Sequence, residues 1–134
     1  GVVSVTAIDR LHLKSDWAFY LDGNVRGGLG AALEFGLLNF VFQRLGLEKP
    51  NSEVIEINEA VVKLHKKFGF VEEGFRRENI IKNENRMGVF FLGLTKSDWD
   101  PRYRFWISFC WDQVRRYVVL VGQDRHFQHT IKFG

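Results

Sequence analysis

A glycine-rich segment directly before a helical pattern is the strongest candidate for chemistry in this sequence. It contains Arg26, Gly27, Gly28 and Gly30, and regularly spaced apolar residues begin right after it. Glycine has no Cβ to obstruct a close approach, and the free N–H groups of a helix N-terminus lie at the positive end of the helix dipole. The segment therefore predicts a phosphate-binding site. The alternative is structural, because the same glycines suit a tight turn that lets the helix pack closely on a sheet.

Strand and helix patterns alternate on both sides of this segment. β-branched and aromatic residues favour strands, apolar residues three or four positions apart favour helices, and glycine often follows a helix end. These signals predict strands over 2–8, 16–21, 53–57, 70–81 and 87–94, and helices over 31–45 and 58–68. Asn58 stands where a helix N-cap is expected. The order β-β-α-β-α-β-β places the chain in the α/β class.

The C-terminal residues differ from the rest of the chain in charge. Residues 101–134 carry six basic and two acidic side chains, whereas residues 1–100 carry 13 and 14. Aromatic and β-branched runs predict strands over 105–111, 117–121 and 127–133, although residues 112–116 also fit a short helix. We therefore expect a core over residues 1–99 and a basic aromatic extension over 100–134, packed on the same domain or on a partner subunit.

Length and composition exclude several classes of protein. The 134 residues suit one domain, and 46% hydrophobic residues suffice for a packed core, so a disordered chain and a disulfide-framework toxin are excluded. Cys110 has no partner for a disulfide and the first residues show no signal-peptide pattern, so we expect a cytoplasmic protein. No apolar stretch approaches the roughly 18 residues of a membrane helix, so no membrane association is expected.

Metal and nucleic acid are not the expected ligands. His126 and His129 lack a third ligand at a suitable spacing, so the sequence predicts no zinc site. Arginines interleaved with aromatic residues in the extension would suit a nucleic-acid surface, but an amphipathic sheet explains them equally well. The glycine segment therefore stays the main functional signal.

Several motifs within residues 19–99 together resemble the GNAT superfamily of acetyl-CoA-dependent N-acetyltransferases. Members carry Gln/Arg-x-x-Gly-x-Gly/Ala at the start of the helix that holds the coenzyme A pyrophosphate, and Gly28 and Gly30 match its two glycines. A second family motif, Asn-x-x-Ala/Val-x-x-Leu-Tyr-x-x-x-Gly-Phe, is matched by Asn58, Val61, Leu64, His65, Gly69 and Phe70. Residues 28–35, 64–70 and 92–99 most resemble the flagellin-glycan branch, which acetylates UDP-linked amino sugars on the route to pseudaminic acid.

The resemblance implies a mixed sheet flanked by helices, with acetyl-CoA as co-substrate and a primary amine as acceptor. A backbone N–H on the strand over 16–21 would polarise the thioester carbonyl. Val25 stands where the family has Gln or Arg, and Arg26 is the nearest basic residue. The residues implied in cofactor binding are Tyr20, Leu21, Arg26, Gly27, Gly28, Leu29, Gly30, Ala31 and Asn58.

The resemblance also implies catalytic residues. His65 replaces a frequent family Tyr whose hydroxyl protonates the departing thiolate, and an imidazolium can perform the same step. The alternative is an ordinary polar side chain near a helix end. Glu53 is the candidate base that takes the amine proton, with Glu56 on the same strand as a weaker candidate. Both could instead be solvated carboxylates, with a water chain as the base.

The family pattern is incomplete in this sequence. Relatives place a strand, two helices and a further strand before the hairpin with which this sequence starts, and those elements supply much of the acceptor pocket. A truncated, non-catalytic relative that binds coenzyme A or serves as an interaction module is therefore the alternative function. The exposed sheet edge that would result predicts that the extension covers it, within one chain or by exchange in a homodimer.

Overall fold

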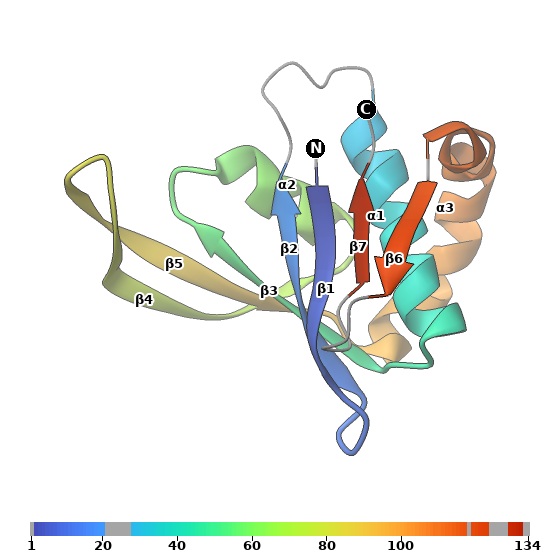
Figure 1. Cartoon of the computed structure of the whole chain (residues 1–134), viewed down its shortest axis with the longest axis horizontal. Helices are drawn as coiled ribbons and strands as arrows, with labels where there is room; N and C mark the ends of the chain where they lie inside the picture. Colours follow the sequence, from blue (N-terminus) through green and yellow to red (C-terminus); the bar gives the residue numbers. More distant parts are fainter. Residues whose placement is uncertain (1, 21–27, 118, 124–128, 133–134) are drawn as a thin grey trace.

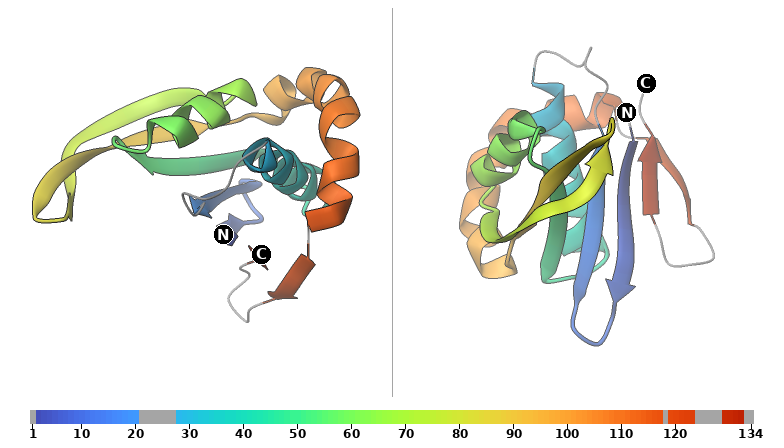
Figure 2. Two further views of the ribbon diagram at one scale, coloured as in Figure 1. Left: turned by 90° about the horizontal axis from the view of Figure 1, so that it is seen from above. Right: turned by 90° about the vertical axis from the view of Figure 1, so that its left-hand side faces the viewer.

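A computed structural model describes residues 2–20, 28–117, 119–123 and 129–132 of the chain. Within these residues, seven strands form one mixed sheet, and helices pack on one of its faces (Figures 1 and 2). The elements are β1 (Val2–Asp9), β2 (Lys14–Tyr20), α1 (Leu29–Asn39), the π-helical turn η1 (Phe40–Arg44), β3 (Lys49–Ile55), α2 (Glu59–Lys67), β4 (Val71–Lys82), β5 (Asn85–Gly93), α3 (Lys96–Tyr117), β6 (Val119–Gln123) and β7 (His129–Lys132). This confirms the α/β class and the helix-flanked mixed sheet expected from the sequence.

The sheet contains one parallel pair of strands at its centre. The strand order is β4-β5-β3-β2-β1-β7-β6, and β2 and β3 run parallel while the other neighbours run antiparallel. The parallel pairing ends at Trp17 and Ser52, although β2 continues to Tyr20 and β3 to Ile55. The two strands therefore diverge beyond Trp17 and Ser52, as Figure 1 shows, and we call this opening the fork.

Alternation along the central strands separates a buried face from an open face. On β3, Pro50, Ser52 and Val54 are buried, whereas Glu53 between them is exposed. Since side chains alternate across a strand, the buried set faces the helices and the others face the opposite side of the sheet. The core on the helix side includes Val5, Trp17, Phe35, Leu38, Val54, Phe68, Leu92 and Trp99. The sheet face opposite the helices is therefore available for a site.

The strand expected over residues 105–111 is wrong, because these residues belong to α3. Trp99, Tyr103, Trp106 and Ile107 recur at helical spacing and pack on the core. Trp99 is fully buried and stacks on Phe42, with ring centroids 6.0 Å apart. Helical periodicity and tertiary packing therefore outweigh the β-propensity of a dense aromatic run. The alternative of a helix over 112–116 is correct, and the expected boundary at residue 99 falls inside α3.

Two strands follow α3, at positions close to those expected over 117–121 and 127–133. β7 pairs antiparallel with β1, from Val2↔Lys132 to Val5↔His129, and β6 pairs with β7. The extension thus contributes two strands to the same sheet as the core in this chain. Among the described residues, none of the helices is both long enough and apolar enough to cross a membrane.

Candidate active site

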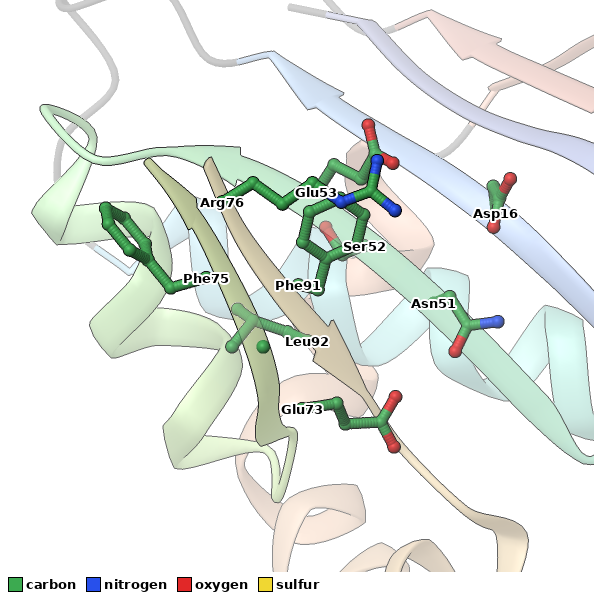
Figure 3. Close-up of a pocket in the computed structure, with 10 residues that line it drawn as sticks. Asp16, Asn51, Ser52, Glu53, Glu73, Phe75, Arg76, Phe91 and Leu92 are labelled. Carbon is green, nitrogen blue, oxygen red and sulfur yellow. The ribbon is translucent and has the colours of Figure 1, made fainter. Parts of the chain in front are cut away.

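A pocket of about 490 Å³ opens on the sheet across β2, β3, β4 and β5 (Figure 3). Its lining residues are Asp16, Asn51, Ser52, Glu53, Glu73, Gly74, Phe75, Arg76, Phe91 and Leu92. Three of these side chains are carboxylates and one is a guanidinium, so the pocket carries an excess of negative charge. Such a lining favours a cationic ligand over an anionic one.

Strand register explains why the acidic side chains meet in this pocket. The parallel ladder pairs Asp16 with Asn51, and both alternate with buried neighbours, which places them on the open face together with Glu53. A register shift between Glu72 and Gly74 adds one residue to β4 at Glu73. The pocket is therefore built from β2, β3 and an irregular part of β4.

Three contacts fix the charged groups on the β4 side of the pocket. Lys49 Nζ donates to Glu73 Oε1 at 2.8 Å and to Asn51 Oδ1 at 2.7 Å, which partly neutralises Glu73. The Arg76 guanidinium lies over the Phe91 ring, 4.8 Å from its centroid, and extends to the same side of the sheet as Glu53 (Figure 3). Glu53 is exposed in the same lining and takes part in none of these contacts.

The fork lies beside this pocket, because Ser52 ends the ladder and also lines the pocket. Beyond Trp17 and Ser52 the facing edges of β2 and β3 make no ladder pairs with each other in the described residues, which leaves backbone groups there for a ligand. β2 ends at Tyr20, and the chain re-enters the described structure at Gly28, the N-cap of α1. Along the chain, the strand that forms one side of the fork and the start of α1 are therefore separated by residues 21–27.

The first turn of α1 is open to a ligand. Gly28 has φ 80° and caps the helix without a side-chain hydrogen bond, and a Cβ built there would meet no described atom within 4 Å. Leu29, Gly30 and Ala31 form the first turn and are half-buried. Positive φ explains why glycine is needed at position 28.

Several predicted cofactor residues cannot be placed in the same detail. Tyr20 forms the C-terminal end of β2, whereas Leu21, Arg26 and Gly27 lie outside the described residues. Asn58 occupies the N-cap position of α2 as expected, but its exposed side chain makes no capping hydrogen bond to that helix. The expected stabilisation of α2 by this side chain is therefore absent.

The structure places His65 in a buried polar cluster on the helix side of the fork. His65 Nδ1 lies 2.7 Å from Glu34 Oε1, and Nε2 lies 3.2 Å from Ser52 Oγ. The His65 ring also contacts Trp17 and Phe70, with centroids 5.6 Å and 5.0 Å away. Glu34 and His65 are both fully buried, and this burial raises the pKa of Glu34 while the nearby imidazole opposes the rise.

Sequence reasoning missed Glu34 and Ser52 as partners of His65. Glu34 is the one charged residue within the apolar helix from Leu29 to Asn39, and a lone carboxylate in such a stretch was the available signal. Ser52 had no comparable signal, because β3 was expected to begin one residue later. Glu56 is committed elsewhere, since its Oε1 accepts a hydrogen bond from Gly88 N–H at 2.8 Å. Glu53 is thus the better placed of the two candidate bases.

The fold is similar to that of solved spermidine N-acetyltransferases from Vibrio cholerae. A point mutant of the enzyme SpeG matches with a TM-score of 0.69 and 26% identity, over 75% of this chain and 60% of that chain. A dodecameric structure of the enzyme matches with a TM-score of 0.68 and 25% identity, over 73% and 58%. A complex with CoA and spermine matches with a TM-score of 0.66 and 24% identity, over 71% and 57%. This chain thus spans less than two thirds of the length of these neighbours.

These neighbours belong to the GNAT superfamily, and the chain shares their α/β fold. The flagellin-glycan branch finds no support among them, because they are named for polyamine amines rather than nucleotide sugars. The sequence matches no protein-family model. It also matches no curated protein.

Proposed function

We propose that the chain is an acetyl-CoA-dependent N-acetyltransferase whose acceptor is a small cationic amine of the polyamine class. The observation that carries this proposal is the meeting of the fork with the acidic pocket, in a fold shared with spermidine N-acetyltransferases. A fork between parallel strands offers unpaired backbone groups, and the adjoining pocket offers carboxylates. One site therefore has room for both an acyl donor and a cationic acceptor.

The cofactor side of the site consists of backbone groups. The N–H groups from Gly28 to Ala31 suit the pyrophosphate of coenzyme A, because they lie at the positive end of α1. The proposed cofactor-binding residues also include Arg26, Gly27 and Asn58. Tyr20, at the end of β2, and the next residue in sequence, Leu21, would hold the arm of the cofactor in this proposal. When bound, acetyl-CoA supplies the activated acetyl group as a thioester.

The acceptor side consists of carboxylates. Asp16, Glu53 and Glu73 attract an ammonium group, which must lose its proton before the nitrogen can attack. Glu53, an exposed carboxylate of the lining, is the proposed acceptor of that proton, and His65 is the proposed source of the proton that the departing thiolate needs. A UDP-linked sugar would instead bring a diphosphate toward three carboxylates. The pocket charge therefore favours a polyamine.

Kinetics with spermidine test this function. We expect acetyl-CoA-dependent acetylation of spermidine, and Glu53→Gln should lower kcat about a hundredfold because the variant cannot accept the amine proton. Glu59→Gln is the matched control, since Glu59 is an exposed carboxylate on α2 away from the pocket lining. Bound acetyl-CoA without transfer to any amine would instead support a non-catalytic, coenzyme A-binding module.

An assembly of identical chains is part of this proposal. One neighbour is described as a dodecamer, and β4 at the end of the sheet exposes Val71, Phe75 and Ile81. Exposed apolar edge strands tend to be covered by a partner. We propose a homodimer as the smallest unit, and light scattering would distinguish it from a monomer or a larger ring. The division at residue 99 and the cytoplasmic location stay predictions from the sequence.

A further inference from the structure

Three polar side chains from three elements form a continuous buried chain of contacts. Glu34 comes from α1, His65 from α2 and Ser52 from β3, and their exposed fractions are 0%, 0% and 3%. The contacts are 2.7 Å from Glu34 Oε1 to His65 Nδ1 and 3.2 Å from His65 Nε2 to Ser52 Oγ. Burial of polar groups to this extent destabilises the folded state unless they form hydrogen bonds. The three side chains are therefore held in one defined arrangement by these contacts.

The chain of contacts runs between the two sides of the proposed active site. Glu34 lies on α1, whose N-cap is Gly28. Ser52 pairs with Trp17, the last residue pair of the β2–β3 ladder before the fork. Ser52 also borders the acidic pocket and directly precedes Glu53 on β3. The cluster therefore ends where the acyl donor and the acceptor would meet.

The proton content of the Glu34–His65 pair decides which way the Ser52 hydroxyl points. The groups that face the imidazole include the Glu34 carboxyl from α1, the Ser52 hydroxyl from β3 and the rings of Trp17 and Phe70. With two protons on the pair, Nε2 carries one and donates it to Ser52 Oγ, which frees the hydroxyl hydrogen for the fork. With one proton on the pair, held between Nδ1 and Glu34, Nε2 accepts from the hydroxyl instead.

Burial favours the state with two protons. Glu34 Oε2 is buried and makes no hydrogen bond within the described part of the chain, so an ionised carboxylate there lacks half of its partners. The raised pKa of Glu34 has the same cause. At rest the pair thus holds two protons, one of them on Nε2.

We propose that Glu34, His65 and Ser52 form a proton relay that serves the departing thiolate, with Glu34 as the positioning residue that keeps a proton on His65 Nε2. This inference rests on the proposed acetyltransfer. As the C–S bond of the thioester breaks and the C–N bond of the amide forms, the Ser52 hydroxyl proton passes to sulfur. The Nε2 proton passes to Ser52 Oγ in the same step, so no free alkoxide forms. The pair is left with one proton. Glu53, having passed the earlier ammonium proton to water, takes the second proton of the nitrogen as the C–N bond forms, and exchange with water resets both groups.

The Ser52 end of the relay is tested by kinetics with acetyl-CoA and spermidine. Ser52→Ala should lower kcat about a hundredfold with little change in the KM for acetyl-CoA, because proton delivery acts in the transition state. Ser52→Thr keeps a hydroxyl and should recover much of the rate. Wild-type kcat in Ser52→Ala overturns the relay.

Ser15→Ala is the matched control for this measurement. Ser15 is likewise buried, at 1% exposure, on the neighbouring strand β2, and its hydroxyl makes no hydrogen bond within the described residues. This variant also removes one buried hydroxyl but leaves the relay intact, so we expect wild-type kcat. A loss equal to that of Ser52→Ala would assign the effect to the sheet rather than to the relay, which also overturns the proposal.

The Glu34 end is tested in the free protein by nitrogen NMR of the His65 ring. In the wild type we expect Nε2 to carry a proton at low pH and to lose it as pH rises, because ionisation of the pair leaves one proton between Nδ1 and Glu34. In Glu34→Gln, whose amide does not ionise, the His65 tautomer should not change with pH. The same pH dependence of the ring nitrogens in both folded proteins overturns the positioning role of Glu34. This readout needs no turnover. If the wild type neither binds nor uses acetyl-CoA, the proposed function is wrong. The NMR measurement still shows whether Glu34 controls the protonation of His65 Nε2.

Discussion

The buried carboxyl group of Glu34 makes the stability of this chain depend on pH. Burial raises its pKa above the ordinary value of 4.5, so the folded chain holds this proton more tightly than the unfolded chain. Between the two pKa values the folded state binds more protons, and the free energy of unfolding falls as pH rises. The contribution of Glu34 is complete below the pKa of the unfolded chain and is lost as pH rises through the folded value.

Glu34→Gln isolates this effect, because the amide has nearly the same shape and does not ionise. Urea unfolding of both proteins over a series of pH values from about 4 to 8 gives the difference in the free energy of unfolding. We expect the wild type to lose stability relative to the variant as pH increases through this window. A difference that is flat with pH, or one that grows in favour of the wild type, would contradict a raised pKa at Glu34.

At the residue level, the sequence predicted the groups that lie on standard family positions and missed those created by tertiary contact. Glycine at position 28 and an exposed carboxylate at position 53 follow from local pattern and resemblance. The partners of His65 do not, because Glu34 and Ser52 are 31 and 13 residues away from it along the chain. Helix periodicity marks position 34 as buried but gives no sign of which side chain on another element it meets.

At the element level, α3 carries much of the aromatic core. Trp99 is fully buried against Phe35, Phe42 and Phe68, and Trp106 stacks on Phe68 with centroids 4.3 Å apart. The sequence predicted a strand here because it is dense in aromatic residues, and such residues suit a strand or a buried helix equally well. A buried helix is distinguished from a strand only by the three- or four-residue spacing of the side chains that pack on the core.

Trp99→Ala tests the packing of α3 on α1. Removal of a fully buried indole should destabilise the chain by about 3–5 kcal/mol, because the surrounding rings cannot close the cavity. Phe105→Ala, on the same helix, should cost less than about 1 kcal/mol since Phe105 is 59% exposed. Urea unfolding gives both values. Equal losses for the two variants would mean that α3 does not bury the face that contains Trp99.

For the whole molecule, the order of the first seven elements was predictable and the opening between them was not. Each element follows from local periodicity, and the observed order β-β-α-β-α-β-β agrees with the prediction. The parallel pairing of β2 with β3 joins residues 35 positions apart, such as Lys14 and Lys49, and it ends at Trp17 and Ser52. No local pattern encodes where a long-range ladder stops.

The central claim is that the fork and the start of α1 together bind coenzyme A, and calorimetric titration with acetyl-CoA tests it most directly. Gly28→Asp is the informative variant, because Asp tolerates positive φ and caps helices but adds a negative charge beside the pyrophosphate. Gly28→Asn keeps the shape without the charge. We predict binding of one acetyl-CoA per chain by the wild type and a dissociation constant at least about tenfold higher in Gly28→Asp than in Gly28→Asn, a difference of about 1.4 kcal/mol. Absence of binding by the folded wild type, or equal affinity in both variants, would contradict the account.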